Sequence, residues 1–248
     1  KYFMTNPSFE CQSVMSYTIF DDSLYKICVS NNMKLVINTL NPHSYVVAKK
    51  DKLFSEALNH SDVLIPDGSG ILLAAKLINK KNIKKISGSD LHDHLLTIAN
   101  KNKSSVFYLG STEETLGMIK KRIAKDFPSI KAATFSPPFK PKLSKDDNDK
   151  IINEINCFAP DFLFIGMTAP KQEKWLHQNR NRLNFKVASC IGAAFDFYAG
   201  KINRPSEIWI DLHLEWMIRF MKEPRRLFWR NFVSTPKFLK DLIFYKYK

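Results

Sequence analysis

The sequence feature that most constrains the fold is a short apolar run that turns at once into a polar helix start. Residues 162–165, Phe-Leu-Phe-Ile, stand between Pro160 and Gly166, and uninterrupted apolar runs of this kind are typical of strands buried on both faces of a sheet. Pro170 follows after a short loop and suits the first turn of a helix, where no N–H donor is needed. Such a turn places the next side chains at the carboxyl edge of a parallel sheet, where open α/β folds bind ligands.

Similar apolar runs alternate with helical patterns along the chain. The predicted strands cover residues 34–38, 62–66, 104–110, 131–135, 162–165 and 186–192. The predicted helices cover residues 44–59, 71–78, 113–126 and 146–157, with further helices from Ser87 or Ser89 to residue 100 and from the Lys171 region onward. A short β unit and a helix over residues 23–30 are expected before them. The alternation predicts an α/β fold with a Rossmann-like, mostly parallel sheet flanked by helices.

The chain of 248 residues divides near Arg204. Residues 1–204 are expected to form the Rossmann-like core, with hydrophobic residues at 44% of the whole chain. Residues 205–248 have few acids, and Trp209, Leu212, Trp216 and Phe220 recur at helical spacing. We expect a C-terminal helical appendage whose basic, aromatic helices suit an anionic membrane interface. The alternative is that these aromatics pack on the sheet domain.

The formal net charge of +14 indicates an anionic partner: phosphates of a small molecule, nucleic acid or a membrane surface. No apolar run approaches the roughly 18 residues of a spanning helix, and the start of the sequence lacks the order of a signal peptide. The four cysteines, which form no CxxC pair, favour neither a zinc site nor a disulfide framework; they are Cys11, Cys28, Cys157 and Cys190.

Asp67 follows the strand at 62–66 and precedes Gly68-Ser69-Gly70. A carboxylate at a strand end, beside glycines that admit a substrate, suits a general base. The competing interpretation is the N-cap of the next helix. The glycine pattern is a broken dinucleotide fingerprint because Leu73 stands in place of the third glycine, which disfavours an NAD-dependent enzyme.

Metal binding is not expected. Asp90, His92, Asp93 and His94 lie close together, but two ligands on one face of a solvated helix start rarely form a site. No Asp-x-Asp element stands at a strand end either. A diphosphate leaving group would then be neutralised by Lys, Arg or backbone N–H groups.

Polar residues follow several of the predicted strands and should meet at one cleft. They are Asn38, Thr39, Asn41, Asp67, Ser111, Gln172 and Asp196.

Several short motifs resemble those of a known enzyme family in their order and spacing. They are NTLNP at 38–42, PDGSG at 66–70, SGSDL at 87–91, YLGS at 108–111, PDFLFIGMTAPKQEKW at 160–175, IGAAFDFYAG at 191–200, RP at 204–205, LEW at 214–216 and EPRR at 223–226. From about Val14 to Arg230 the chain resembles the WecG/TagA/CpsF glycosyltransferases, bacterial enzymes that transfer a sugar from a UDP-sugar to a polyprenyl-diphosphate-linked acceptor.

The resemblance implies an inverting enzyme that uses neither a metal nor a cofactor. Asp67 would take the proton from the acceptor hydroxyl, with Thr39 and Asn41 lining the same pocket, and Gln172 would orient the donor sugar. The residues expected at the nucleotide of the donor are Lys85, Gly110, Lys171, Gly192, Asp196, Arg219, Arg226 and Arg230. Lys85 replaces an arginine usual in the family and keeps its charge without its bidentate fork.

The resemblance leaves the donor sugar open. N-acetylmannosamine or its uronic acid is expected, and transfer of glucose or glucuronic acid in exopolysaccharide synthesis is the alternative. A non-catalytic protein that binds anionic lipid or nucleic acid would explain the charge but not the grouping of Asp67, Asn41 and Gln172. The expected partners are the UDP-sugar, the lipid-linked acceptor and an anionic membrane rather than nucleic acid, at the cytoplasmic face of the bacterial inner membrane. Self-association stays open.

Overall fold

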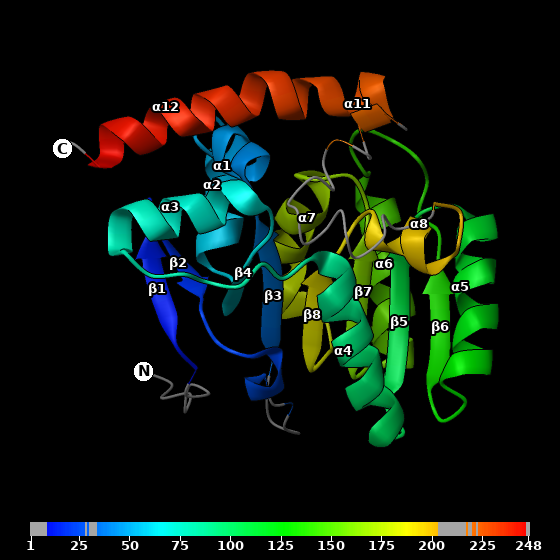
Figure 1. Ribbon diagram of the computed structural model, residues 1–248. Helices are drawn as coiled ribbons and strands as arrows, with labels where there is room; N and C mark the ends of the chain where they lie inside the picture. Colours follow the sequence, from blue (N-terminus) through cyan, green and yellow to red (C-terminus); the bar gives the residue numbers. More distant parts are fainter. Residues whose placement is uncertain are drawn as a thin grey trace.

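The structure is a computed structural model that describes residues 9–27, 29, 34–202, 217, 220–221 and 223–246. Its centre is a six-stranded sheet in the order β4-β3-β8-β7-β5-β6, and every neighbouring pair is parallel (Figure 1). The strands are β3 (Leu35–Leu40), β4 (Val63–Pro66), β5 (Ser105–Gly110), β6 (Lys131–Phe135), β7 (Phe162–Gly166) and β8 (Val187–Cys190). The predicted Rossmann-like parallel sheet is therefore confirmed.

Helices alternate with these strands. They are α1 (Pro42–Ala48), α2 (Lys52–Asn59), α3 (Ser69–Asn79), α4 (Gly88–Lys101), α5 (Glu113–Asp126), α6 (Lys145–Phe158), α7 (Lys171–Asn179) and α8 (Ala194–Tyr198). The C-terminal part contains α11 (Pro224–Phe228), a π-helical stretch η3 (Trp229–Ser234) and α12 (Thr235–Lys246). A hairpin of β1 (Cys11–Val14) and β2 (Tyr17–Phe20) precedes the sheet, and short 3₁₀ turns cover Leu24–Lys26 and Arg180–Arg182.

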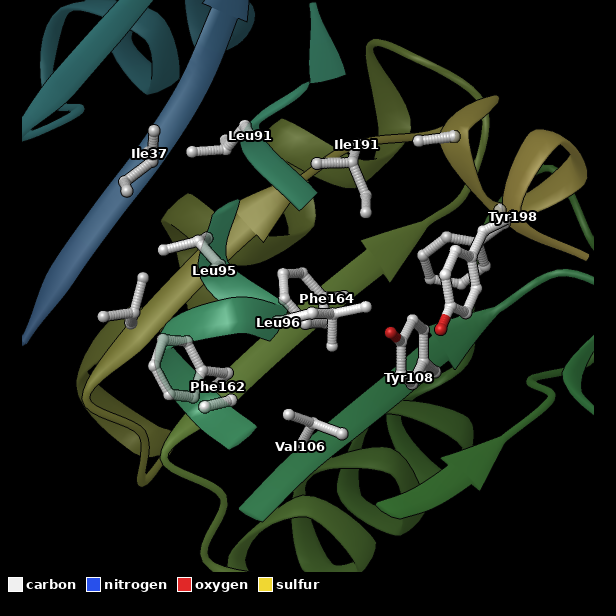
Figure 2. Packing of buried hydrophobic residues seen from close by; sticks show 14 of the residues in the cluster. Ile37, Leu91, Leu95, Leu96, Val106, Tyr108, Phe162, Phe164, Ile191 and Tyr198 are labelled. Carbon is white, nitrogen blue, oxygen red and sulfur yellow. The ribbon is translucent and has the colours of Figure 1, made fainter. Parts of the chain in front are cut away.

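Both faces of the sheet are covered, as the apolar strands require. On one face, Leu91, Leu95 and Leu96 of α4 pack over Val106 and Phe162 (Figure 2). On the other face, side chains of α6 and α7 pack against strand residues; they include Ile151, Ile155, Trp175 and Leu176. A third cluster joins the hairpin, α1, α2, α3 and α12 beside β3 and β4.

Three local predictions are wrong. The helix predicted over 44–59 is two helices, because Asp51 caps a new start by accepting a hydrogen bond from Phe54 N at 3.0 Å. In the described part of residues 23–30, the predicted helix is replaced by a 3₁₀ turn over Leu24–Lys26, followed by Ile27, which is buried in the core. Pro170 is the N-cap of α7 rather than its first helical residue. Most of the helix predicted over 209–220 lies outside the described residues.

The carboxyl ends of the parallel strands share one edge of the sheet. In Figure 1 the strand arrows point toward the side on which α12 lies across α1 and α3. Phe238 of α12 is fully buried there, with its ring 5.3 Å from that of Tyr45 in α1. The C-terminal helix is thus packed at the edge where the predicted site residues are found.

Candidate active site

Asp67 leaves β4 beside the end of β3. Its N–H donates a hydrogen bond to Leu40 O at 2.8 Å, which fixes the turn against the neighbouring strand. Gly68 has φ of 98°, a conformation that favours glycine, and it is Gly68 that occupies the N-cap position of α3. The N-cap position of this helix is therefore Gly68 rather than Asp67.

Asn41 lies next to the Asp67 turn. Its Oδ1 accepts a hydrogen bond from Ser44 N at 3.0 Å and so caps α1. A Cβ added to Gly68 would lie 3.9 Å from Asn41 Cβ, so the two loops are in contact. Thr39 lies within β3 rather than after it, in register with Ile65. The structure thus brings Asp67 and Asn41 together at the ends of two neighbouring strands.

Gln172 and the turn at Gly192 form a second group. The Gln172 side chain is only 4% exposed, and its Oε1 accepts a hydrogen bond from Met167 N at 3.1 Å. Gly192 has φ of 47°, and a Cβ there would lie 3.5 Å from Gln172 Nε2. One amide therefore holds the loop after β7 and packs against the turn after β8.

The entrance to α4 connects these two groups. Ile86 N donates to Pro66 O at 3.0 Å, and a Cβ on Gly88 would lie 3.4 Å from Ile191 O. Lys85 is partly exposed and directly precedes this link. The sheet order puts β3 and β8 between β4 and β7, so the exits of β4 and β7 are three strand spacings apart, roughly 14 Å.

The other residues expected at the nucleotide occupy different parts of this edge. Gly110 has φ of 113°, and a Cβ there would lie 2.6 Å from Gly166 O, so only glycine fits between the exits of β5 and β7. Lys171 Nζ donates to Lys140 O at 2.5 Å in the loop after β6. Asp196 lies in α8, and its carbonyl accepts from Lys201 N at 3.0 Å.

Arg230 brings positive charge from the C-terminal helices to α1. It lies in η3, and it lowers the pKa of His43, after the larger effect of burial. His43 Nδ1 and Ser234 Oγ are 2.8 Å apart, which joins the same two elements. Since His43 is two residues from Asn41, Arg230 lies on the Asp67 side of the edge. Arg219 and the side chain of Arg226 are outside the described residues.

Comparison with known proteins decides the family. The Glycosyl transferase WecG/TagA/CpsF family matches residues 14–248. The chain belongs to this family. A similar protein of Bacillus spizizenii, the N-acetylglucosaminyldiphosphoundecaprenol N-acetyl-beta-D-mannosaminyltransferase, is 31% identical over 226 residues, 91% of this chain and 85% of that protein. The equally named protein of Bacillus subtilis is 30% identical over 221 residues, 89% and 84% of the two chains. That of Staphylococcus aureus is 28% identical over 198 residues, 80% and 75%.

Of the two histidines that suggested a metal site in this glycosyltransferase, His92 has a different partner. His92 is buried, its Nε2 is 2.6 Å from Tyr108 OH, and burial lowers its pKa to about 3. Asp90 forms a capping box with Ser87 at the start of α4. Within the described ranges, no three side chains of His, Cys, Asp or Glu are grouped as metal ligands would be.

Sequence reasoning placed Glu173 at the helix start with Lys171 and Gln172 but gave it no role. It is 5% exposed in the first turn of α7, and Gln172 Nε2 donates to its Oε1 at 2.8 Å. Burial raises the pKa of Glu173 to about 7. Helical spacing could have found it, because Glu173 lies three residues before the buried Leu176 and so shares its face.

The C-terminal helices of the glycosyltransferase present an apolar outer surface. Phe238 and Leu242 point into the protein, whereas Leu239 and Ile243, one position along, are exposed. We call the exposed apolar residues of this region the outer face: Phe228, Trp229, Phe232, Leu239, Ile243, Phe244 and Tyr245. Arg225, Lys237 and Lys240 lie exposed among them. No helix in the described part of the chain is long and apolar enough to cross a membrane.

Proposed function

We propose that this glycosyltransferase moves an N-acetylmannosamine-type sugar, or its uronic acid, from a UDP-sugar to a polyprenyl-diphosphate-linked sugar. The names of the relatives support this donor and acceptor class, at 30–31% identity over most of the chain. The observation that carries the proposal is the contact between the Asp67 turn and Asn41, on neighbouring strands of a parallel sheet. It sets a carboxylate and an amide where this fold class binds substrates.

The proposed reaction is a single displacement. The Asp67 carboxylate takes the proton of the acceptor hydroxyl while the acceptor oxygen bonds to the anomeric carbon of the donor. The bond from that carbon to the UDP oxygen breaks, and its electron pair leaves with UDP. Attack from the face opposite the leaving group inverts the anomeric centre. Thr39 and Asn41 would line the acceptor side, and Gln172 would orient the donor through the loop that it holds.

Protein cations would stabilise the departing UDP in place of a metal ion. Lys85, next to the link between β4 and β8, and Arg230, near α1, are both placed at the carboxyl edge. Lys171, Arg219 and Arg226 would add to this charge, while the backbone at Gly110 and Gly192 and the side chain of Asp196 would meet the nucleoside. The net charge of +14 is in keeping with this demand.

The outer face would rest on an anionic membrane, at the cytoplasmic side where we place the enzyme. Two observations support this. The outer face combines exposed aromatics, among them Trp229 at 67%, with exposed lysines and arginines. Its helices also contact α1 and α3, which begin at the proposed site. A lipid-linked acceptor would then reach Asp67 without leaving the membrane surface.

A panel of UDP-sugars, incubated in detergent with a short-chain polyprenyl-diphosphate N-acetylglucosamine, tests the proposal by mass spectrometry of the products. Transfer of N-acetylmannosamine or its uronic acid is expected, and the rate should not change with EDTA. Transfer of glucose or glucuronic acid would change the donor assignment. No transfer from any member of the panel, or a strict need for Mg²⁺ or Mn²⁺, would contradict the proposed mechanism.

A further inference from the structure

The carboxyl group of Glu173 is buried, and burial disfavours its charged form. Only one of its two oxygens is satisfied by a described partner, since Oε1 accepts from Gln172 and the buried Oε2 has none. An ionised carboxylate that is shielded from water costs several kcal/mol unless a cation or several donors surround it. The raised pKa of Glu173, about 7, has this origin in burial.

Glu173 lines a small cavity between α2, β3 and α7. The cavity has a volume of about 10 Å³ and is lined by Val36, Asn38, Ala57, His60, Glu173, Leu176, His177 and Arg180. Asn38 Oδ1 is also buried without a described partner, while its Nδ2 donates to Ser61 Oγ at 2.9 Å. Two acceptor-bearing side chains thus line one small cavity. A proton on the Glu173 carboxyl group supplies the hydrogen-bond donor that Glu173 Oε2 and Asn38 Oδ1 otherwise lack.

The cations around this cavity are directed elsewhere. Arg180 donates to Asp62 at 2.7 Å and to Lys34 O at 2.9 Å. His177 has a lowered pKa, first because of burial, and its ring lies 5.2 Å from that of His60. The buried thiol of Cys190 has a raised pKa, through burial and then through the charge of Glu173. The groups that face Glu173 from α2, β8 and α7 therefore favour its neutral form.

The Glu173 carboxyl group is bonded to a residue of the proposed site, because its Oε1 accepts a hydrogen bond from Gln172 Nε2. Gln172 Oε1 in turn accepts a hydrogen bond from Met167 N–H, and Gln172 Nε2 packs against the turn at Gly192. We propose that Glu173 in its uncharged form is a positioning residue that keeps Gln172 and the loop at 166–170 in the geometry required for transfer. Ionisation places a charge beside Asn38 Oδ1 and Cys190, and the start of α7 must shift to hydrate it. This inference rests on the proposed function, because the loop matters only if Gln172 serves the donor.

Transfer rates measured between about pH 6 and about pH 9 test the inference with four proteins. They are the wild type, Glu173→Gln, Glu173→Ala and the control Glu154→Gln, which removes an exposed carboxylate from α6. The wild type and the control should lose activity above about pH 7, approaching tenfold per pH unit. Glu173→Gln should stay within about threefold of the wild type below pH 7 and lose the alkaline decline, since the amide copies the neutral acid. Glu173→Ala should be slow at every pH.

An alkaline decline that survives in Glu173→Gln would overturn the inference, as would equal rates for the Gln and Ala variants. Melting temperatures over a wider pH range, from about 4 to about 9, distinguish a wrong role for Glu173 from a wrong assignment of the reaction, because they need no sugar transfer. Relative to Glu173→Gln, the wild type should become less stable between about pH 4.5 and about pH 7, even if no sugar is transferred. Parallel melting profiles of the two proteins would refute the buried neutral acid itself.

Discussion

Gly68 packs against Asn41, so the turn that carries Asp67 and the cap of α1 form one unit. A Cβ on Gly68 would lie 3.9 Å from that of Asn41, and Asp67 N–H is bonded to Leu40 O, the residue before Asn41. The base and the pocket proposed for the acceptor are therefore set by the register of β3 and β4. Changes at either loop should affect both stability and transfer.

Substitutions at Asn41 separate those two effects. Asn41→Ala removes the oxygen that accepts from Ser44 N and should lower the free energy of unfolding by about 1 kcal/mol in urea titrations. Asn41→Asp keeps a capping oxygen and should restore stability, but transfer should stay low because the amide donor is lost and a second carboxylate faces the acceptor. Wild-type transfer by Asn41→Asp would limit Asn41 to its role as a cap.

Gly110 and Gly117 form a matched pair of glycines. Gly110→Ala should destabilise the protein by about 2 kcal/mol or more, because φ is positive and the new methyl group would meet Gly166 O at 2.6 Å. Gly117→Ala, in the middle of α5 with no atom within 4 Å of the added Cβ, should stabilise it by up to about 1 kcal/mol. Thermal unfolding of both variants measures the contrast. Equal effects would show that the exits of β5 and β7 are not tightly packed.

Substitutions on the two sides of α12 should differ in their effects on stability and on membrane binding. Phe238→Ala empties a fully buried position and should cost about 3 to 5 kcal/mol of stability. Ile243→Ser, on the outer face at 58% exposure, should leave stability within about 0.5 kcal/mol but weaken sedimentation with anionic vesicles. Unchanged vesicle binding by Ile243→Ser combined with Phe244→Ser would contradict the proposed membrane contact.

The pH dependence of stability should reflect the titration of Glu173. Its pKa in the folded protein, about 7, lies above the unfolded value near 4.5, so the folded state binds the proton more tightly. The stabilising effect is complete below about pH 4.5 and is lost as the pH rises to about 7, by up to about 3 kcal/mol. The difference in unfolding free energy between wild type and Glu173→Gln should follow this curve. A constant difference would mean that Glu173 titrates like an exposed carboxyl group.

Much of the fold follows from the sequence. Five of the six strands of the sheet were predictable because most of their residues are buried and they read as apolar runs. The sixth strand, β6, was also predicted, although it lies at the edge of the sheet and its residues are exposed or only partly buried. The break between α1 and α2 was missed because one side chain, Asp51, outweighs a continuous helical pattern. The packing of Phe238 was equally out of reach, since it depends on contacts with Tyr45 and Gly70, far away in the sequence.

The position of the candidate site residues in the fold was predictable in part, while their roles stay predictions. Asp67, Asn41, Gln172 and Gly192 were expected at one edge, and they lie there, because parallel strands put their exits together. Sequence position could not show that Gln172 is buried or that Glu173 beside it is a buried acid with only one oxygen bonded to a described partner. Three polar residues in a row at a helix start predict side chains exposed to solvent. The packing of α7 on β3 and β8 buries Gln172 and Glu173 instead.

Replacing Asp67 by asparagine tests the central claim most directly. The measurement is the rate of transfer at saturating UDP-sugar and lipid acceptor, alongside calorimetric affinity for UDP, with Asp146→Asn as an exposed control that loses the same charge. The account predicts that Asp67→Asn lowers the rate by about 10² to 10⁴ with UDP affinity nearly unchanged, and that Asp146→Asn behaves as wild type. Transfer by Asp67→Asn at a rate close to that of the wild type would show that another group takes the proton.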